Sequence, residues 1–189
     1  QAEFIAGHVG PEFARQGIQT RIWCWDHNFE PIGWPRNVLN DPAAAPYIDG
    51  TAFHHYAGRP VAMARLSAMF PSKHIYFTEG SIFGVRGAIE IIAILRNWAR
   101  SYNAWVTVID DTGQPNRGPH RIGPTCIVLD SATKTLLYSY DYCMYSHFMR
   151  FIHRDAVRIE STDFRSVRFA NAAFSLSMGR DVRQAALSI

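Results

Sequence analysis

Four short apolar runs alternate along this sequence with segments that have the periodicity of helices. The apolar runs cover residues 18–28, 51–58, 74–81 and 104–116, and the helical segments cover residues 1–17, 41–50, 60–70 and 87–103. The last helical segment has the clearest amphipathic pattern. Strands that alternate with helices predict a parallel sheet, in which each helix returns the chain to the start of the next strand.

Polar residues gather where three of the four apolar runs end. Asp26, His27 and Asn28 close the first run, a His-His-Tyr sequence closes the second, and Glu79 stands at the end of the third. A (β/α)8 barrel builds its active site on the loops that leave the carboxyl ends of its strands. Four strands cannot close such a barrel, whose usual length is about 250 residues. The pattern therefore fits either an open sheet or the second half of a barrel.

The sequence changes character after Pro124. Strand-like segments cover residues 126–139 (two strands around a turn), 156–162, 167–176 and 182–189. An aromatic stretch at 142–152 fits a helix, but strands dominate the region. We therefore predict two domains, one at residues 1–123 with the parallel sheet and one at residues 124–189 that is all-β.

Composition and charge exclude several classes of protein. Apolar residues make up 48% of the chain and charged residues 19%, as in globular proteins with a core. The longest apolar run falls short of 18 residues, so no membrane span is expected. The net charge is only +3 and the arginines are scattered, so no nucleic-acid partner is expected.

The sequence carries no pattern for a metal or cofactor site. Cys24, Cys126 and Cys143 share no CxxC spacing, and neither a G-x-S-x-G elbow nor a Gly-rich phosphate loop occurs. His54 and His55 are adjacent in a strand, so their side chains point to opposite faces and cannot share an ion. We expect no metal and no cofactor.

Five motifs occur in an order and spacing that resemble one known family. They are WDHN at 25–28, DGTAFHHYAG at 49–58, FTEG at 77–80, W-x-x-x-x-D-x-x-G-x-P-N from Trp105 to Asn116, and YSHFMRFIHRDAVRIEST at 145–162. Together they resemble glycoside hydrolase family 30, which contains glucosylceramidases, β-1,6-glucanases and β-xylosidases. The resemblance covers nearly the whole chain and implies a hydrolase that acts on β-linked glycosides, oligosaccharides or glycolipids.

The resemblance also implies a fold. The family has a (β/α)8 TIM barrel with a side β-sandwich, so residues 1–123 would supply barrel strands 5–8 and residues 124–189 part of the side domain. The family's general acid/base belongs to an Asn-Glu-Pro motif at the end of strand 4, and this chain has no such motif. The similar NFEP sequence follows a different strand, so the role is not assigned to Glu30. The N-terminal half of the barrel, or another chain, would have to complete the fold.

Retaining hydrolysis needs two carboxyl groups about 5–5.5 Å apart, one of which attacks the anomeric carbon. The resemblance implies that Glu79 is this nucleophile and that Tyr56 hydrogen-bonds its carboxylate. Trp105, which we expect to open the fourth strand, would stack on the sugar ring. Further predicted substrate-binding residues are His54, Asp26, Asn28 and Trp34, the last of them on a loop. The isolated chain, which lacks the acid/base, is predicted to be inactive.

Two other interpretations stay open. The chain could be a non-catalytic carbohydrate-binding or scaffold fragment of the same fold, which the missing acid/base and Val106, in place of the family's usual Asn, both favour. It could instead be a small doubly wound α/β domain that binds a ligand at its strand ends. That domain would have both sheet edges covered, whereas half a barrel would leave its outer strands, near residues 20–26 and 105–110, without neighbours. For the location, the family resemblance favours a secreted or extracellular protein.

Overall fold

The computed structural model describes residues 1–81, 83–115, 125–162, 170–178 and 181–188, and it divides the chain into two compact units. The first unit comprises Gln1–Gly80 with Asn97–Asn103, and the second comprises Ser81–Arg96 with Ala104–Ile189. The expected boundary at residues 123 and 124 lies outside the described residues, as do Asn116 of the fourth motif and parts of the strands predicted at 167–176 and 182–189.

The chain begins with the helix predicted at residues 1–17. It comprises α1 (Ala2–Phe4), a π-helical turn η1 (Ile5–Val9) and α2 (Gly10–Gln16), which follow one another without a break. Gly17 ends it with a positive φ of 67°, and its N–H returns to the carbonyl groups of the last turn. This conformation favours glycine, because any Cβ would be strained there.

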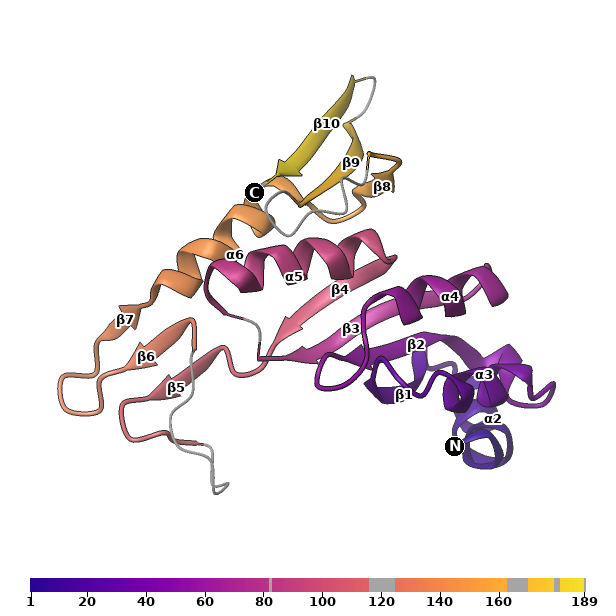
Figure 1. Cartoon of the computed structure of the whole chain (residues 1–189). Coiled ribbons are helices and arrows are strands. Elements are labelled where there is room, and N and C mark those ends of the chain that lie inside the picture. Colours follow the sequence, from indigo (N-terminus) through magenta and orange to yellow (C-terminus); the bar gives the residue numbers. More distant parts are fainter. Residues whose placement is uncertain (82, 116–124, 163–169, 179–180, 189) are drawn as a thin grey trace. The chain divides into compact units, whose positions relative to one another are not determined.

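A four-stranded sheet forms the centre of the first unit (Figure 1). Its strands are β1 (Ile22–Asn28), β2 (Ile48–His54), β3 (His74–Gly80) and β4 (Ala99–Ala104), in the order β1-β2-β3-β4. The pairs β1–β2 and β2–β3 are parallel, as the alternating pattern predicts. Within the described residues, β1 and β4 therefore stand at the two ends of this sheet.

Three helical segments lie in the connections before and after β2, and the sequence predicted them only in part. Between β1 and β2 lie α3 (Gly33–Asn40) and a 3-10 turn η2 (Ala45–Tyr47), and between β2 and β3 lies α4 (Val61–Met69). The helix α3 stands where we expected a loop. Its pattern is hard to read because one short stripe, Pro35 with Val38 and Leu39, supplies all of its buried residues.

The helix predicted at residues 87–103 is wrong in its second half. The helix α5 (Gly84–Arg96) ends at Arg96, Trp98 has a positive φ of 77°, and β4 follows. The Tyr102 ring stacks on Phe77 with centroids 4.9 Å apart, and Ser101 Oγ donates to the Phe77 carbonyl at 3.3 Å. These contacts with β3 hold the segment as a strand despite its helical pattern.

The fourth strand is therefore not the one predicted at residues 104–116. Trp105 follows β4 directly instead of opening a strand, and Val108–Asp110 forms β5 in a different sheet. The expected unpaired edge near residues 105–110 is also wrong, because β5 pairs with β6 (Ile127–Leu129).

Buried aromatic rings form the core of the first unit on one face of its sheet. Phe29, Phe53 and Phe77 are all at most 1% exposed, and the ring of Phe29 lies 6.2 Å from Phe53 and 6.1 Å from Phe77. Burial of each such side chain contributes about 1.5–3 kcal/mol. Other residues with at most 1% exposure in this unit include Cys24, Ala44, Ile48, Thr51, Ala52, Ala62, Met63 and Leu66.

Where the structure describes it, the second unit combines two small sheets with two helices. One sheet has the order β5-β6-β7, in which β5 and β6 are parallel and β7 (Leu136–Tyr138) is antiparallel to β6. The other sheet has the order β10-β9-β8 and only antiparallel pairs. Its strands are β8 (Val157–Ile159), β9 (Asn171–Met178) and β10 (Asp181–Ser188). Ser139 caps the N-terminus of the helix α6 (Tyr140–Phe151), because its hydroxyl accepts a hydrogen bond from the Tyr142 N–H. The helix α6 agrees with the helix that the aromatic stretch at 142–152 suggested, so this region is not purely β.

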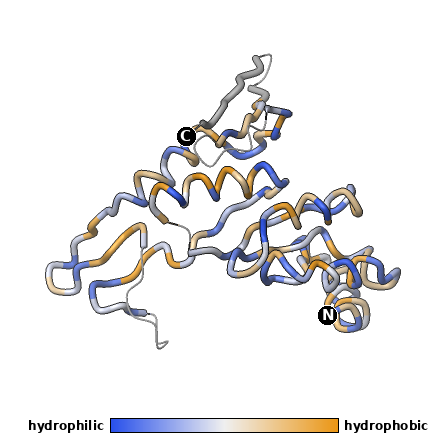
Figure 2. Tube along the Cα trace, viewed as in Figure 1, coloured by the Kyte–Doolittle hydropathy of each residue, from blue (hydrophilic) through white to orange (hydrophobic). Residues whose placement is uncertain are grey.

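The helix α5 packs against α6 and β9. Apolar and polar residues alternate along it (Figure 2), and its buried residues are Gly87, Ala88, Ile91, Ile92 and Ile94. At its end the Arg96 guanidinium donates to both Ser161 and Asn171.

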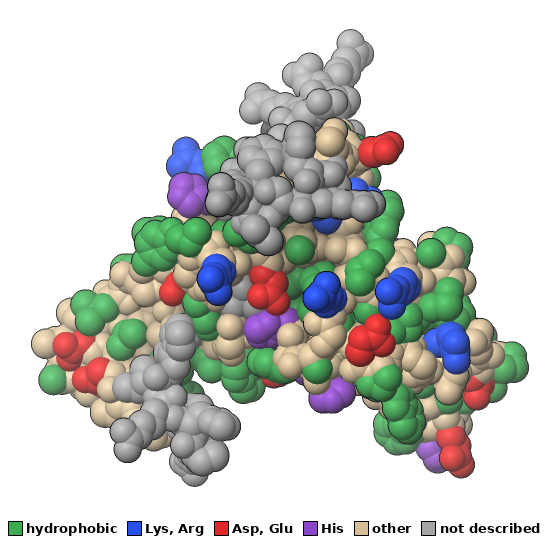
Figure 3. All heavy atoms as spheres, viewed as in Figure 1, with side chains coloured by type: hydrophobic (Ala, Val, Ile, Leu, Met, Phe, Trp, Pro, Cys, Tyr) green, Lys and Arg blue, Asp and Glu red, His purple; other side chains and the backbone are tan. Residues whose placement is uncertain are grey.

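None of the described helices is long and apolar enough to cross a bilayer. On the face shown in Figure 3, Lys and Arg side chains stand apart from one another, and acidic side chains lie between several of them. This arrangement agrees with the small net charge of +3.

Gly50 and Gly33 give a matched pair of substitutions for this sheet. A Cβ on Gly50 would lie 2.3 Å from the backbone oxygen of His74 in the neighbouring strand, whereas a Cβ on Gly33 would meet nothing within 4 Å. We expect Gly50→Ala to lower the free energy of unfolding by about 1–3 kcal/mol, because the backbone of β3 must move. Gly33→Ala should leave it unchanged or raise it by up to about 1 kcal/mol. Urea unfolding followed by circular dichroism measures both, and equal midpoints would contradict the packing of β2 on β3.

Candidate active site

Two irregularities in strand pairing shape one end of the sheet. In β1, Trp25 pairs with Ala52 and His27 pairs with Phe53, so Asp26 is an extra residue between them. Trp25 and Asp26 both have positive φ, 77° and 56°. A β-bulge of this kind changes the face to which the following side chains point, and bulges are frequent next to active sites.

The second bulge lies in β3. Phe77 and Glu79 pair with consecutive residues of β2, Phe53 and His54, so Thr78 is the extra residue. In a regular strand Glu79 would share a face with Phe77, which points into the core with 0% exposure. The bulge instead gives Glu79 the same side of the sheet as Thr78.

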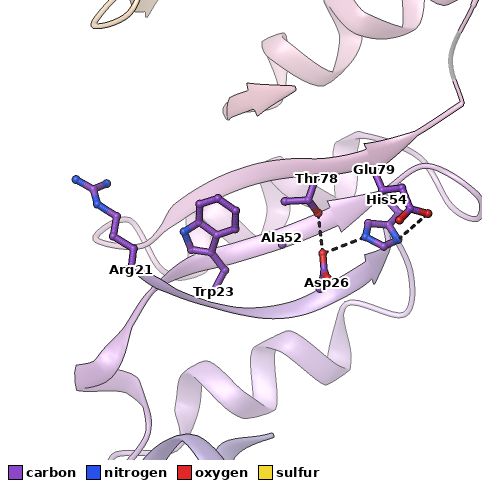
Figure 4. Close-up of a pocket in the computed structure, with 7 residues that line it drawn as sticks. All are labelled: Arg21, Trp23, Asp26, Ala52, His54, Thr78 and Glu79. Carbon is purple, nitrogen blue, oxygen red and sulfur yellow. Dashed lines mark hydrogen bonds and ion pairs between the residues drawn. The ribbon is translucent and has the colours of Figure 1, made fainter. Parts of the chain in front are cut away.

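A cavity of about 310 Å³ lies on this side of the sheet (Figure 4). It is lined by Arg21, Trp23, Asp26, Ala52, His54, Thr78 and Glu79. Three of these residues, Asp26, His54 and Glu79, were predicted from the sequence. The cavity belongs entirely to the first unit.

A chain of polar contacts connects the two carboxylates of the cavity. Asp26 Oδ1 accepts a hydrogen bond from Thr78 Oγ1 at 2.8 Å and lies 3.0 Å from His54 Nε2. The other ring nitrogen, Nδ1, lies 3.9 Å from Glu79 Oε1. The side chains are 65% exposed for Asp26, 27% for Glu79 and 12% for His54. The imidazole is therefore the enclosed member, between two acids that solvent reaches.

Gly80 follows Glu79 and is buried. A Cβ at this position would lie 2.6 Å from Cζ of Phe77 and 3.1 Å from Cδ2 of His55. The absence of a side chain at Gly80 therefore leaves room for the Phe77 ring directly behind the cavity.

A second polar cluster occupies the other end of the same strands. The Tyr76 hydroxyl donates to Asp49 Oδ2 at 2.5 Å, His74 Nδ1 lies 3.1 Å from the same oxygen, and Arg21 Nη1 lies 3.5 Å from Asp49 Oδ1. The ring of Trp23 stacks on Tyr76 with centroids 4.0 Å apart. This cluster holds Arg21 and Trp23, the two cavity residues farthest from Glu79 in Figure 4.

The cluster perturbs three pKa values. Partial burial alone would raise the pKa of Asp49, but hydrogen bonds from Tyr76 and His74 and the charges of His74 and Arg21 outweigh it, so the pKa is lowered. Burial and the hydrogen bond to Asp49 raise the pKa of the Tyr76 hydroxyl. The pKa of Arg21 is raised by its hydrogen bond with Tyr76 and by the charge of Asp49. Asp49 is thus held as a carboxylate.

Tyr56 and Asn28 were predicted to bind substrate, and neither lines the cavity. Tyr56 lies two residues beyond β2, is 50% exposed, and has its ring 4.7 Å from that of His55 and 6.2 Å from that of His54. Asn28 ends β1 opposite His54. Its Oδ1 is buried and has no hydrogen-bond partner among the described residues.

The two predicted tryptophans also lie outside the cavity lining. Trp34 is on α3 and is 65% exposed, so its expected place on a loop is wrong. Trp105, in the second unit, is 53% exposed, and its backbone carbonyl accepts from Ser81 Oγ at 2.8 Å.

Sequence reasoning missed four residues that line the cavity: Arg21, Trp23, Ala52 and Thr78. Thr78 belongs to the FTEG motif and could have been found there. Arg21 and Trp23 follow the alternation of a strand that ends in polar residues, but they resemble ordinary strand residues. Among the described residues, no group of three or more His, Cys, Asp or Glu is arranged to hold a metal ion.

Comparison with known proteins gives one family. Residues 1–152 match the glycosyl hydrolase family 30 TIM-barrel domain. An endo-1,6-β-D-glucanase of Neurospora crassa is 27% identical over 175 residues, which are 85% of this chain and 35% of that protein. The lysosomal acid glucosylceramidase of Mus musculus is 25% identical over 193 residues, which are 88% of this chain and 37% of that protein.

The solved structure of an endo-β1,6-glucanase is similar in fold, with a TM-score of 0.81 at 21% identity. The similarity covers 100% of this chain and 52% of that chain. This chain thus spans just over a third of the length of the two curated relatives and about half of the length of the solved structure.

The lowered pKa of Asp49 predicts how the stability of the fold depends on pH. A carboxyl group whose folded-state pKa is lowered stabilises the native state above its ordinary pKa, 3.8 here, and this stabilisation is lost as the pH falls through the folded-state value. We expect Asp49→Asn to lower the free energy of unfolding by about 1–3 kcal/mol at neutral pH. The variant should also lose less stability than the unchanged chain below pH 4. Denaturation curves between pH 7 and pH 2.5 measure both effects.

Glu12→Gln is the control, because Glu12 pairs with Arg15 at 2.6 Å on the solvent-exposed face of α2. Solvent screens such a pair, so its removal should hardly change the acid slope. Equal slopes for Asp49→Asn and the unchanged chain would contradict the role assigned to the Asp49 cluster.

Proposed function

Because this chain belongs to glycosyl hydrolase family 30, we propose that it forms the nucleophile-bearing part of a retaining β-glycosidase, with Glu79 as the nucleophile. The observation that carries the proposal is the position of the Glu79 carboxylate. It stands at the carboxyl end of a parallel strand, in a polar cavity, where the bulge at Thr78 turns it away from the core. A nucleophile must reach the anomeric carbon, and Glu79 is 27% exposed.

The second carboxylate of the cavity, Asp26, is unsuited to be the general acid. An acid must carry the proton that it donates to the leaving oxygen. The Oδ1 of Asp26 is already engaged within the protein: it accepts a hydrogen bond from Thr78 and lies within hydrogen-bond distance of His54. We propose that the general acid/base is a carboxyl group outside residues 1–189, in a longer protein. The relatives' greater length supports this proposal.

We further propose that the sheet β1-β2-β3-β4 is the second half of a (β/α)8 barrel, followed by part of a side β-domain. Membership of a TIM-barrel family supports this, as do the parallel pairs of β1, β2 and β3. The positions of β1 and β4 at the ends of the described sheet agree with half a barrel better than with a doubly wound domain whose edges are covered.

For the substrate we propose a β-glucosyl or β-xylosyl compound, either an oligosaccharide or a glycolipid. Two of the curated relatives are named as an endo-1,6-β-D-glucanase and a lysosomal acid glucosylceramidase, and both names refer to glucosyl compounds. Exposed aromatic side chains suit sugar rings, since their faces pack on C–H groups. Tyr56, Trp34 and Trp105 are each at least half exposed and remain the proposed substrate-binding aromatics.

The first test removes the nucleophile from the full-length enzyme. Glu79→Gln should lower kcat by at least about three orders of magnitude, because the covalent intermediate cannot form. Glu30→Gln is the matched control: Glu30 lies near the end of β1, but it accepts from the Ile32 N–H at 2.9 Å and lies 3.7 Å from Arg65. The Glu30→Gln variant should keep normal turnover of an aryl β-glucoside. Near-normal turnover by the Glu79→Gln variant would contradict the proposal.

A second test concerns residues 1–189 alone. They should not hydrolyse an aryl β-glycoside, and activity should return when the N-terminal part of the barrel is supplied as a second fragment. In the restored enzyme a 2-fluoroglycoside should label Glu79, as peptide mass spectrometry would detect. Turnover by the isolated chain would refute the proposal that the general acid/base lies outside residues 1–189. Sugar binding without any label would instead favour a non-catalytic carbohydrate-binding module.

A further inference from the structure

The imidazole of His54 lies between two carboxylates, those of Asp26 and Glu79. Its Nε2 lies 3.0 Å from Asp26 Oδ1 and its Nδ1 lies 3.9 Å from Glu79 Oε1 (Figure 4). Imidazole has only these two polar atoms, and both face an acid. The side chain is also only 12% exposed. Each nitrogen of His54 therefore has a carboxylate as its neighbour, which suggests a role other than the sugar binding predicted from the sequence.

We propose that His54 is a positioning residue for Glu79, and that Asp26 and Thr78 hold His54 in place. The part of this inference that concerns catalysis rests on the proposed role of Glu79 as the nucleophile. The contact itself does not depend on that role. Asp26 fixes one side of the ring, and the opposite nitrogen then faces the Glu79 carboxylate.

The two bulges support this assignment. Asp26 and Thr78 are the extra residues of their strands, and they bond to each other at 2.8 Å across the cavity side of the sheet. Thr78 Oγ1 also lies 3.4 Å from the Phe53 carbonyl, so its hydroxyl is anchored to the strand that carries His54. Without Thr78, an Asp26 side chain that is 65% exposed would be free to rotate into solvent.

The remaining neighbours of His54 leave its two nitrogens to the acids. The rings of His27 and Tyr56 both lie 6.2 Å from His54 and meet it at steep angles, 73° and 84°. These edge contacts restrict the tilt of the imidazole. The contact at 3.9 Å is longer than a hydrogen bond, and contacts at active sites commonly shorten when substrate binds.

A second Asp–His pair in the same sheet provides an internal comparison. His74 Nδ1 lies 3.1 Å from Asp49 Oδ2 at the opposite end of the strands. There the acid's other neighbours are Tyr76 and Arg21. The Asp49–His74 pair therefore serves as a control for the Asp26–His54 pair: a change in the former should leave the signals of His54 unchanged.

The first experiment observes the imidazoles directly, by two-bond nitrogen–proton NMR spectra of the full-length enzyme. The His54 signals are assigned by their loss in His54→Gln. We expect Asp26→Asn to shift the Nε2 signal of His54 and Glu79→Gln to shift its Nδ1 signal, whereas Asp49→Asn shifts signals of His74 only. Unchanged His54 signals in Glu79→Gln would overturn the proposal, even if Glu79 is the nucleophile.

The second experiment measures kinetics in the full-length enzyme. His54→Asn keeps an amide near the position of Nδ1, and His54→Gln keeps one near Nε2, so each preserves half of the bridge. Each should lower kcat by about 100-fold with KM within about twofold, because a misplaced nucleophile slows the reaction without weakening sugar binding.

Thr78 supplies the conservative pair for the same assay. Thr78→Ser keeps the hydroxyl that Asp26 accepts from and should retain kcat, whereas Thr78→Val should lower kcat by about 10-fold or more. A rise in KM with unchanged kcat in the His54 variants would make His54 a sugar ligand and overturn the proposal. Loss of activity in Glu79→Gln together with normal kcat in both His54 variants would overturn it while leaving the proposed function intact.

Discussion

The packing of three phenylalanine rings beneath the sheet is the constraint on which the candidate site depends. Phe53 and Phe77 face each other across β2 and β3, and Phe29 lies against both from the end of β1. His54 and Glu79 are the next paired residues after these rings. Because the rings are fully buried, the strands cannot slide past one another without opening the core. The aromatic core thereby fixes the position along the strands at which His54 and Glu79 lie on the opposite face of the sheet.

The two ends of the strands differ in how their polar groups are satisfied. At the end where the strands begin, Asp49 accepts from Tyr76 and is close to both His74 and Arg21, so a single carboxylate is surrounded by donors. At the other end Glu79 has the imidazole of His54 at 3.9 Å and an open cavity beside it. A fully satisfied carboxylate stabilises a fold, whereas a partly satisfied one retains affinity for a ligand.

Much of this arrangement could be predicted from the sequence, because short apolar runs with polar ends are strong local signals. They located β1, β3, the parallel sheet and the acid at residue 79, and they located β2 in part, since the strand predicted at 51–58 begins at Ile48 and ends at His54. Two elements escaped prediction. The strand β4 has a helical pattern and is held in the sheet by its contact with Phe77. The helix α3 has only a short buried stripe, so its residue Trp34 was placed on a loop. The bridge from Asp26 to Glu79 escaped prediction because periodicity assumes regular pairing, and both strands depart from it.

The bulges at Asp26 and Thr78 also bear on how sequences of this kind should be compared. Each adds one residue to a strand without changing which apolar residues fill the core, so the register of the core and the register of the cavity are offset by one. Two strands of equal length and similar composition can then present different side chains to a ligand, and strands of unequal length can present the same one. An alignment gap of one residue beside Asp26 or Glu79 is consequently a structural character in its own right, as informative about the site as an exchange of the acid.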